Sequence, residues 1–344
     1  MSSMTERTRS SILVMGSQGV RSTGSPTTRI SRIAMGAILS RPEGHLAGGT
    51  TRTCVACQAR AMESIDRRWV AVRWPVPAGS DDKYSRGVVG IVAGSEAYPG
   101  AAALVASAAI RTGIGLVRYV GPRRAQDLVL SMRPEVVVHD SGEATERLPR
   151  VSAWVIGPGV ADHPGQDAVI GAVLASGVPL VVDAGALEAC ARARAAGDRQ
   201  APPDRVLMTP HARELVATLG AMRHDITEED VARDREAHAR LLAETARATV
   251  LLKGSPTLVA PPGGAVVTLP DAPAWLATAG SGDVLAGIAG ALLASGLSAL
   301  EAGVAASWIH ARAAEAASGG GPIAALDIAD ALPAVVAELL LEGS

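Results

Sequence analysis

Aromatic residues and cysteine are scarce in this chain of 344 residues. It contains no Phe, its aromatic content is 2% and it has three cysteines, whereas 48% of its residues are hydrophobic. A core of Ala, Val, Leu and Ile suits helices packed on a buried parallel sheet. Three cysteines cannot form a disulfide scaffold, and the one Cys-x-x-Cys, at Cys54 and Cys57, lacks the second pair of a metal site. We expect incidental thiols and a reducing compartment.

Long apolar runs and a strong net charge are also missing. No apolar stretch reaches the roughly 18–20 residues of a membrane-spanning helix without a Gly, Pro or charged residue, and residues 11–20 are too short and Gly-rich for a signal-peptide core. The formal net charge of −2 gives no electrostatic footprint for nucleic acid or an anionic membrane. We expect a cytoplasmic protein with no nucleic-acid or membrane partner. The sequence leaves its oligomeric state, including a homo-oligomer, open.

The N-terminal region differs in character from the rest. Residues 1–70 are rich in Arg, Ser, Thr and Gly, poor in acids, and have no sustained period of 2 or 3.6. This pattern predicts an unstructured leader that is dispensable for stability, although a transit peptide has a similar composition. Residues 71–81 contain two prolines, which disfavour a helix or a central strand, so we expect a linker there.

From residue 87 onward, short β-branched runs alternate with Ala-rich segments of helical length. This alternation predicts an α/β fold with a mainly parallel central sheet covered by helices. Two further runs separated by Pro-Pro-Gly-Gly predict an antiparallel hairpin at the end of the sheet. The expected strands are 88–93, 116–120, 136–139, 153–156, 180–182, 206–208 and 250–252, the hairpin is 257–260 with 265–269, and the expected helices include 101–112, 166–175, 228–246, 281–294, 299–317 and 326–341.

Several polar residues follow the expected strands, where ligands bind in open α/β sheets. Asp183 and His211 each follow a strand, with Glu214 three residues after the histidine, and Lys253 ends another strand. The histidine has an ordinary alternative as a hydrogen-bonded loop residue, and Asp183 could satisfy nearby backbone amides. A lysine at the end of an apolar strand is costly unless it is paired or reaches solvent or phosphate.

The stretch Gly280-Ser-Gly-Asp283 opens a strongly apolar helix. Its glycines let the backbone approach a ligand, and the first helix amides suit a phosphate or a developing oxyanion. Asp283 is placed to act as a base on a hydroxyl beside that phosphate; the alternative is that Asp283 only caps the helix. No Walker or Rossmann glycine motif is present.

These motifs together resemble a known family. Residues 82–341 are similar to the dehydratase domain of the NAD(P)H-hydrate repair enzymes, which are ribokinase-like proteins. The matching stretches are Tyr98-Pro-Gly-Ala-Ala, Gly157-Pro-Gly, Val182-Asp-Ala-Gly-Ala-Leu187, Leu207-Met-Thr-Pro-His-Ala-Arg-Glu214, Leu251-Leu-Lys-Gly and Ala277-Thr-Ala-Gly-Ser-Gly-Asp-Val-Leu-Ala-Gly287. The resemblance implies a ribokinase-like three-layer α/β/α sandwich over residues 82–342.

The resemblance also implies a reaction and a set of site residues. The substrate would be the S-form hydrate of NADH or NADPH, dehydrated at the expense of ADP or ATP, with Mg²⁺ accompanying the nucleotide near Glu214 through water. Asp283 would be the catalytic base and a hydrate contact. The nucleotide would contact Lys253, Gly254, Ser255, Pro256, Thr257 and Gly282, and the hydrate Ala101, Gly159 and His211. The resemblance names no direct metal ligand.

The sequence departs from the family pattern at two places. Ala212-Arg213 stands where many relatives have Pro-Gly, and residues 269–275 replace an Asn-containing loop; both differences concern the expected substrate loops. The epimerase domain often fused upstream would need more residues, and more α/β alternation, than the leader offers, so we expect no epimerase activity.

Two other functions fit the same motifs. A ribokinase-like kinase for a vitamin precursor or a sugar would use the same Asp283 and helix. A nucleotide-binding module without turnover would have no need of that base.

Overall fold

The computed structural model describes residues 65–161, 164–197 and 200–341 of the chain. All of them belong to one compact unit. Its strands are β1 (Val88–Val92), β2 (Leu116–Val120), β3 (Val137–His139), β4 (Ala153–Ile156), β5 (Leu180–Val182), β6 (Val206–Met208), β7 (Thr249–Leu252), β8 (Leu258–Ala260) and β9 (Val267–Thr268).

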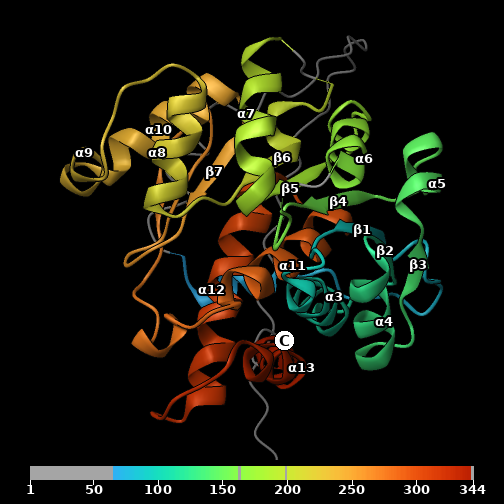
Figure 1. The fold of residues 1–344 in the computed structure, drawn as a ribbon. Helices are drawn as coiled ribbons and strands as arrows, with labels where there is room; N and C mark the ends of the chain where they lie inside the picture. The colour runs from blue at the N-terminus through green and yellow to red at the C-terminus, as the bar shows by residue number, and fades with distance from the viewer. Residues whose placement is uncertain (1–64, 162–163, 198–199, 342–344) are drawn as a thin grey trace, which may run out of the picture. The chain divides into compact units, whose positions relative to one another are not determined.

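The helices alternate with the strands along most of the chain and dominate its last part (Figure 1). They are α2 (Arg67–Ala71), α3 (Pro99–Thr112), α4 (Arg123–Met132), α5 (Ser141–Glu146), α6 (Pro164–Leu174), α7 (Leu187–Ala195), α8 (Ala212–Ala221), α9 (Glu228–Arg233), α10 (Arg235–Ala246), α11 (Ser281–Ala294), α12 (Ala299–Ser318) and α13 (Ala325–Leu341), with short 3₁₀ turns η1 (Ala184–Ala186), η2 (Pro203–Arg205) and η3 (Ala274–Leu276).

The strands form one sheet in the order β3-β2-β1-β4-β5-β6-β7-β8-β9. Pairing is parallel from β3 through β7; β8 then pairs antiparallel with β7, and β9 pairs antiparallel with β8. The predicted mainly parallel sheet with a terminal hairpin is therefore confirmed. Because β5, β6 and β7 are neighbours, the loops that follow their carboxyl ends meet at one edge of the sheet.

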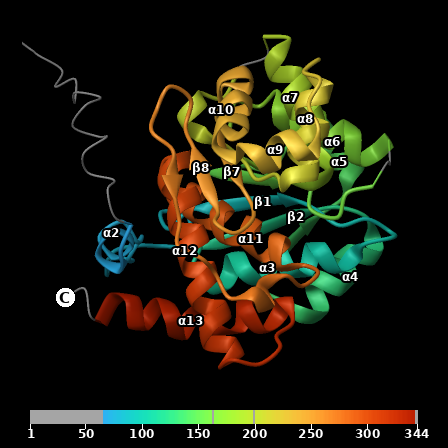
Figure 2. The same ribbon diagram turned by 90° about the vertical axis from the view of Figure 1, so that its left-hand side faces the viewer.

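Helices cover both faces of the sheet (Figure 2). Alternate strand residues face opposite cores: Val155 and Leu207 join the core with α3, α11, α12 and α13, whereas Ile156 and Met208 join the core with α6, α7, α8 and α10. The structure has the expected ribokinase-like three-layer α/β/α arrangement.

Glycine makes room for the few large side chains and for close helix packing. A Cβ on Gly90 of β1 would overlap the indole of Trp154, which lies beside it in register on β4. In α11, a Cβ on Gly287 would meet the backbone of α3 at Val105. The central helix α11 therefore packs directly on its neighbours, which fixes the position of its N-terminal turn.

The long helix expected over residues 228–246 is two helices. Asp234 leaves the helical conformation (φ −147°, ψ 82°), and its carboxylate accepts a hydrogen bond from the Ala237 amide at 2.9 Å, capping α10. Aspartate at this position competes with the helix backbone, so the prediction of one continuous helix was wrong.

The expected leader and linker also need correction for residues 65–81. Arg67–Ala71 is helix α2, with Asp66 as its N-cap, and Val70 is fully buried. Trp74, only 7% exposed, joins the core with α12 and α13. The hydrophobic core therefore includes residues that precede position 82. Residues 1–64 of the expected leader, with Cys54 and Cys57, lie outside the described residues.

Cys190 lies in α7 and is fully buried. Among the helices that the structure describes, none combines the length and apolar character needed to cross a membrane.

Candidate active site

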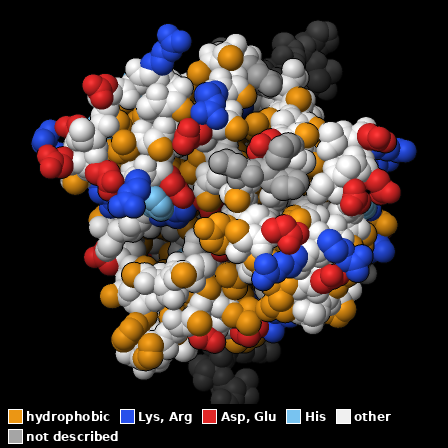
Figure 3. All heavy atoms as spheres, in the orientation of Figure 1, with side chains coloured by type: hydrophobic (Ala, Val, Ile, Leu, Met, Phe, Trp, Pro, Cys, Tyr) orange, Lys and Arg blue, Asp and Glu red, His pale blue; other side chains and the backbone are white. Residues whose placement is uncertain are grey.

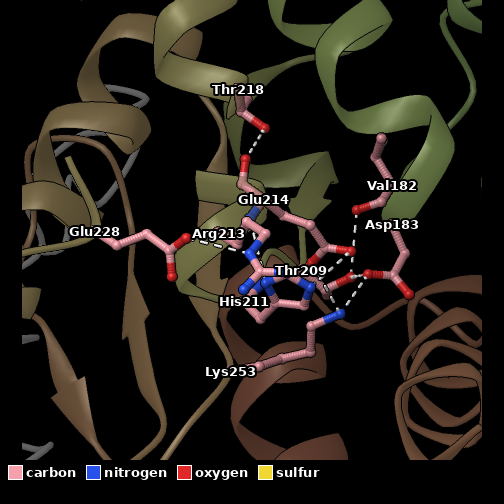
Figure 4. Close-up of polar contacts among 9 residues, drawn as sticks. All are labelled: Val182, Asp183, Thr209, His211, Arg213, Glu214, Thr218, Glu228 and Lys253. Atoms are coloured by element: carbon pink, nitrogen blue, oxygen red, sulfur yellow. Dashed lines mark hydrogen bonds and ion pairs between the residues drawn. The ribbon is translucent and has the colours of Figure 1, made fainter. Parts of the chain in front are cut away.

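Lys253 lies at the centre of a charged cluster at the carboxyl ends of β5, β6 and β7 (Figure 4). Its Nζ atom lies 2.8 Å from Asp183 Oδ1 and 3.3 Å from Glu214 Oε2. The Asp183 side chain is 3% exposed and also accepts a hydrogen bond from the Thr209 hydroxyl at 2.9 Å. Burial alone would lower the pKa of Lys253, but the two carboxylates outweigh it and raise that pKa, so the lysine stays charged.

These contacts decide between the two interpretations of Asp183. Its side chain makes no capping hydrogen bond to the η1 turn that follows it. Its partners are an ammonium and a hydroxyl, so a role in satisfying local amides is not what the structure shows.

His211 and Glu214 form the N-terminal capping box of α8. The Glu214 carboxylate accepts from the His211 amide at 2.7 Å, and His211 Nδ1 accepts from the Glu214 amide at 3.2 Å. His211 therefore makes the hydrogen bonds expected if it were an ordinary loop residue. About half of its side chain remains exposed. The box also fixes the Glu214 carboxylate against Lys253. Figure 3 shows acidic, basic and histidine side chains side by side at the rim of a hollow on this face.

Asp283 lies in the first turn of α11, next to this cluster. Gly280, in the left-handed conformation (φ 86°), is the N-cap, and no side chain caps the helix. The capping interpretation of Asp283 is therefore wrong. Burial raises the pKa of Asp283 to about 6, helped by the negative charges of Asp183 and Glu214 and opposed by Lys253. A carboxylate with such a pKa is a stronger base than an ordinary aspartate and is still ionised at pH 7.

A cavity of about 380 Å³ lies against this turn. Its lining includes Lys253, Gly282, residues of the β7–β8 loop, and Ser307 and His310 of α12. Five of the six predicted nucleotide residues line it, namely Lys253, Gly254, Ser255, Thr257 and Gly282. The sixth, Pro256, does not; its carbonyl oxygen accepts a hydrogen bond from Arg235 at 2.6 Å.

Two of the residues expected to contact the hydrate, Ala101 and Gly159, do not line this cavity. Gly159 and Ala101 are adjacent, because a Cβ on Gly159 would overlap that of Ala101. The first turn of α11 has α3 on one side, where Gly280 faces Leu104, and Lys253 on the other, 3.5 Å from the Cβ position of Gly282. The turn that carries Asp283 therefore lies between Lys253 and α3, the helix that carries Ala101.

Sequence reasoning gave no role to three residues that shape this region. Thr209 bonds to Asp183, Arg235 donates to the carbonyls of Lys253 and Pro256, and His310 lines the cavity. The loop 269–275, expected near the hydrate, instead supplies Ala272, Pro273 and Ala274 to the cavity wall. Thr209 had a signal, since it stands between a strand and His211; the other two sit inside helical patterns.

Among the described residues, no group of three or more His, Cys, Asp or Glu side chains is arranged to hold a metal ion. Asp183 and Glu214 both contact Lys253, which lines the cavity. This arrangement fits an Mg²⁺ ion that is carried on nucleotide phosphates and keeps its water ligands, as Mg²⁺ commonly does.

The fold and the site together define a ribokinase-like enzyme domain with a glycine turn, an aspartate and a lysine facing a cavity. The family profile described as NAD(P)H-hydrate dehydratase matches residues 89–333. The chain therefore belongs to the NAD(P)H-hydrate dehydratase family, which confirms the resemblance seen in the sequence.

Individual relatives agree with this assignment. The bifunctional NAD(P)H-hydrate repair enzyme of Mycobacterium leprae is 44% identical over 246 residues, covering 71% of this chain and 49% of that protein. The ADP-dependent (S)-NAD(P)H-hydrate dehydratase of Neisseria meningitidis is 32% identical, covering 80% and 88%. The chain thus spans about half the length of the bifunctional relatives.

A solved structure shows the same fold. It is the ADP/ATP-dependent NAD(P)H-hydrate dehydratase of Bacillus subtilis co-crystallised with ATP and Mg²⁺, with a TM-score of 0.71, 25% identity, and coverage of 80% of this chain and 97% of that one.

Proposed function

We propose that this chain dehydrates the S-form hydrates of NADH and NADPH with ADP as phosphoryl donor, and with ATP as the alternative donor. One observation carries the proposal. Asp283, with a pKa of about 6, stands in the first turn of α11, which lies between Lys253 of the cavity and α3, the helix that carries Ala101. A base between a phosphate site and an acceptor site is what phosphoryl transfer to a hydroxyl requires.

The reaction would proceed in two steps. In the first, Asp283 takes the proton of the hydrate's hydroxyl, the oxygen bonds to the β-phosphorus of ADP, and AMP leaves. In the second, the carbon–oxygen bond breaks, phosphate departs and a proton is lost from the adjacent ring carbon, which restores the double bond of the reduced nicotinamide. Phosphorylation is needed because hydroxide is a poor leaving group and phosphate a good one.

The remaining residues would position charge. The Lys253 ammonium and the first amides of α11 would balance the negative charge of the transferred phosphoryl group. Magnesium, when bound, would neutralise the nucleotide phosphates. Asp183 and Glu214 would hold its water ligands, and Asp183 keeps Lys253 oriented toward the same place.

The direct test is to incubate the protein with NADH hydrate, ADP and Mg²⁺ and to follow the absorbance of reduced nicotinamide. We expect the absorbance to return with formation of AMP, and a parallel reaction with ATP to show which donor is preferred. If neither nucleotide restores the absorbance although ADP binds, the proposed reaction is wrong. The same mixture with a vitamin precursor or sugar in place of the hydrate tests the kinase alternative.

A further inference from the structure

Arg235 is the first residue of α10, and its guanidinium bridges two carbonyl groups of the loop between β7 and β8. The helix starts at this point because Asp234 caps it. Nη1 of Arg235 donates to the carbonyl oxygen of Pro256 at 2.6 Å, and Nη2 donates to that of Lys253 at 3.1 Å. A guanidinium presents its donors in one rigid plane. The two bonds therefore fix both ends of the loop segment 253–256 relative to α10.

The guanidinium also packs closely on the residue that follows Lys253. A Cβ on Gly254 would overlap Nη2 of Arg235, and Gly254 has a φ of 145°, a conformation that favours glycine. In the part of the chain that the structure describes, the Arg235 side chain bonds to the two loop carbonyls alone and pairs with no carboxylate. Its polar contacts are therefore all with the loop that supplies most of the predicted nucleotide residues.

The positions of the two carbonyls determine the direction of two amide groups. In a planar trans peptide, the C=O and the N–H of the next residue point in opposite directions. The peptides that follow Lys253 and Pro256 are both trans. The N–H groups of Gly254 and Thr257 therefore point away from the guanidinium. Among the described residues, neither of these amides has a hydrogen-bond partner. Gly254 and Thr257 line the cavity, whereas Arg235 does not.

We propose that Arg235 is a positioning residue of the nucleotide site, which holds the β7–β8 loop so that the amides of Gly254 and Thr257 can donate to phosphate oxygens of ADP. Backbone amides that the protein leaves without partners are suitable donors for a phosphate. Arg235 acts through the loop and does not touch the nucleotide. The proposal rests on the proposed function, which puts ADP in this cavity, and it extends the nucleotide site to a residue outside the cavity.

Calorimetry with ADP and Mg²⁺, without the hydrate, tests this role. Arg235→Ala removes both bonds to the loop, and we expect it to bind ADP about 10-fold more weakly than wild type. Arg235→Lys keeps the positive charge, but an ammonium is a point charge without the planar fork that bridges two carbonyls. We therefore expect Arg235→Lys to bind ADP at least about threefold more weakly than wild type.

Steady-state kinetics separate positioning from a general loss of structure. In both Arg235 variants, the KM for ADP should rise by about the same factor as the dissociation constant. The kcat at saturating ADP should stay within about twofold of wild type, because Asp283 and the first turn of α11 are unchanged.

Arg240→Ala is the matched control. Arg240 lies on the same helix, and its Nη1 also donates to a loop carbonyl, that of Gly264, at 2.8 Å. The loop that contains Gly264 joins β8 to β9 and does not line the cavity. Arg240→Ala should lower the melting temperature to an extent similar to Arg235→Ala, and its affinity for ADP should remain within about twofold of wild type.

Three results would overturn the inference while leaving the proposed function standing. Arg235→Ala could bind ADP as tightly as wild type. Arg235→Lys could do so, which would show that the charge alone matters; this variant decides the question if Arg235→Ala does not fold. Arg240→Ala could weaken ADP binding as much as Arg235→Ala does, which would show a general effect of α10.

Failure of the proposed function would look different. If wild-type protein binds ADP but does not restore reduced nicotinamide, the proposed reaction is wrong, and the calorimetric comparison still decides the role of Arg235. If wild-type protein does not bind ADP, the proposed function and the inference are both refuted.

Discussion

The Nζ atom of Lys253 lies 2.8 Å from Oδ1 of Asp183, although 70 positions separate the two residues in the sequence. The pair forms because β5 and β7 flank β6 in the sheet, so both residues follow strands that end at the same edge. Each charge makes the other tolerable in a buried place, and each is therefore needed for stability as well as for any role toward a ligand.

Replacing Lys253 by Ala should destabilise the fold. It leaves the Asp183 carboxylate, 3% exposed, with the Thr209 hydroxyl as its remaining side-chain partner. Breaking a buried ion pair costs about 3–5 kcal/mol, which chemical denaturation would measure. The double variant Lys253→Met with Asp183→Asn removes both charges and should recover most of that loss. In calorimetry, the double variant should bind ADP more weakly than wild type, because it lacks the Lys253 ammonium. Wild-type affinity in the double variant would show that Lys253 does not contact the nucleotide.

Asp283→Asn should slow turnover by about 10²–10⁴-fold, the usual contribution of a positioned general base. ADP affinity should change little, because Lys253 and the helix amides remain. Since Asp283 caps nothing, Asp283→Ala should match Asn in both rate and folding. A rate for Asp283→Asn above about a tenth of wild type would rule out the base.

The rate should also report the ionisation of Asp283. With a pKa of about 6, the carboxylate takes up a proton as the pH falls below 6, and kcat/KM should fall with it, because that ratio reports the free enzyme. A pH profile with no change between pH 5 and 7 would contradict the assignment. The residual activity of Asp283→Asn should lack this dependence.

The free energy of unfolding should change with pH in the direction opposite to that of kcat/KM. The pKa of Asp283 is raised from 3.8 in the unfolded chain to about 6 in the folded one, so the folded state binds the proton more tightly. Asp283 therefore makes the protein less stable as the pH rises from about 4 through 6. Asp283→Asn should exceed wild type in melting temperature at pH 7 and equal it below pH 4. Equal melting temperatures at both pH values would show that the carboxyl group is not strained by burial.

The segment before residue 82 should matter for stability. Trp74→Ala should lose about 3–5 kcal/mol, as for other buried aromatic residues, because Trp74 is 7% exposed in the core with α12 and α13. A chain that begins at Ser80 should melt well below one that begins at Asp66. Val72→Ala, which changes a side chain that is 68% exposed, is the matched control and should have little effect.

The sequence predicted the sheet and most helices because short β-branched runs alternate with Ala-rich segments of helical length. It could not predict which charges would pair, since the partners of Lys253 depend on the order of β5, β6 and β7. His310 was not predicted because an Ala-rich helix with little amphipathic contrast does not reveal which face meets a cavity. Trp74 carried a usable signal, because a large aromatic side chain adds much to a core that contains no Phe.

The contact of Trp154 with Gly90 constrains how this sheet can change over generations. Because the indole fills the space of the missing side chain on the neighbouring strand, the two positions are not independently mutable. A lineage that acquires Ala at position 90 must already carry a smaller residue at position 154, since the reverse order passes through a sterically blocked intermediate. Substitution at position 154 must therefore come before substitution at position 90, and glycine is retained at position 90 for as long as tryptophan occupies position 154.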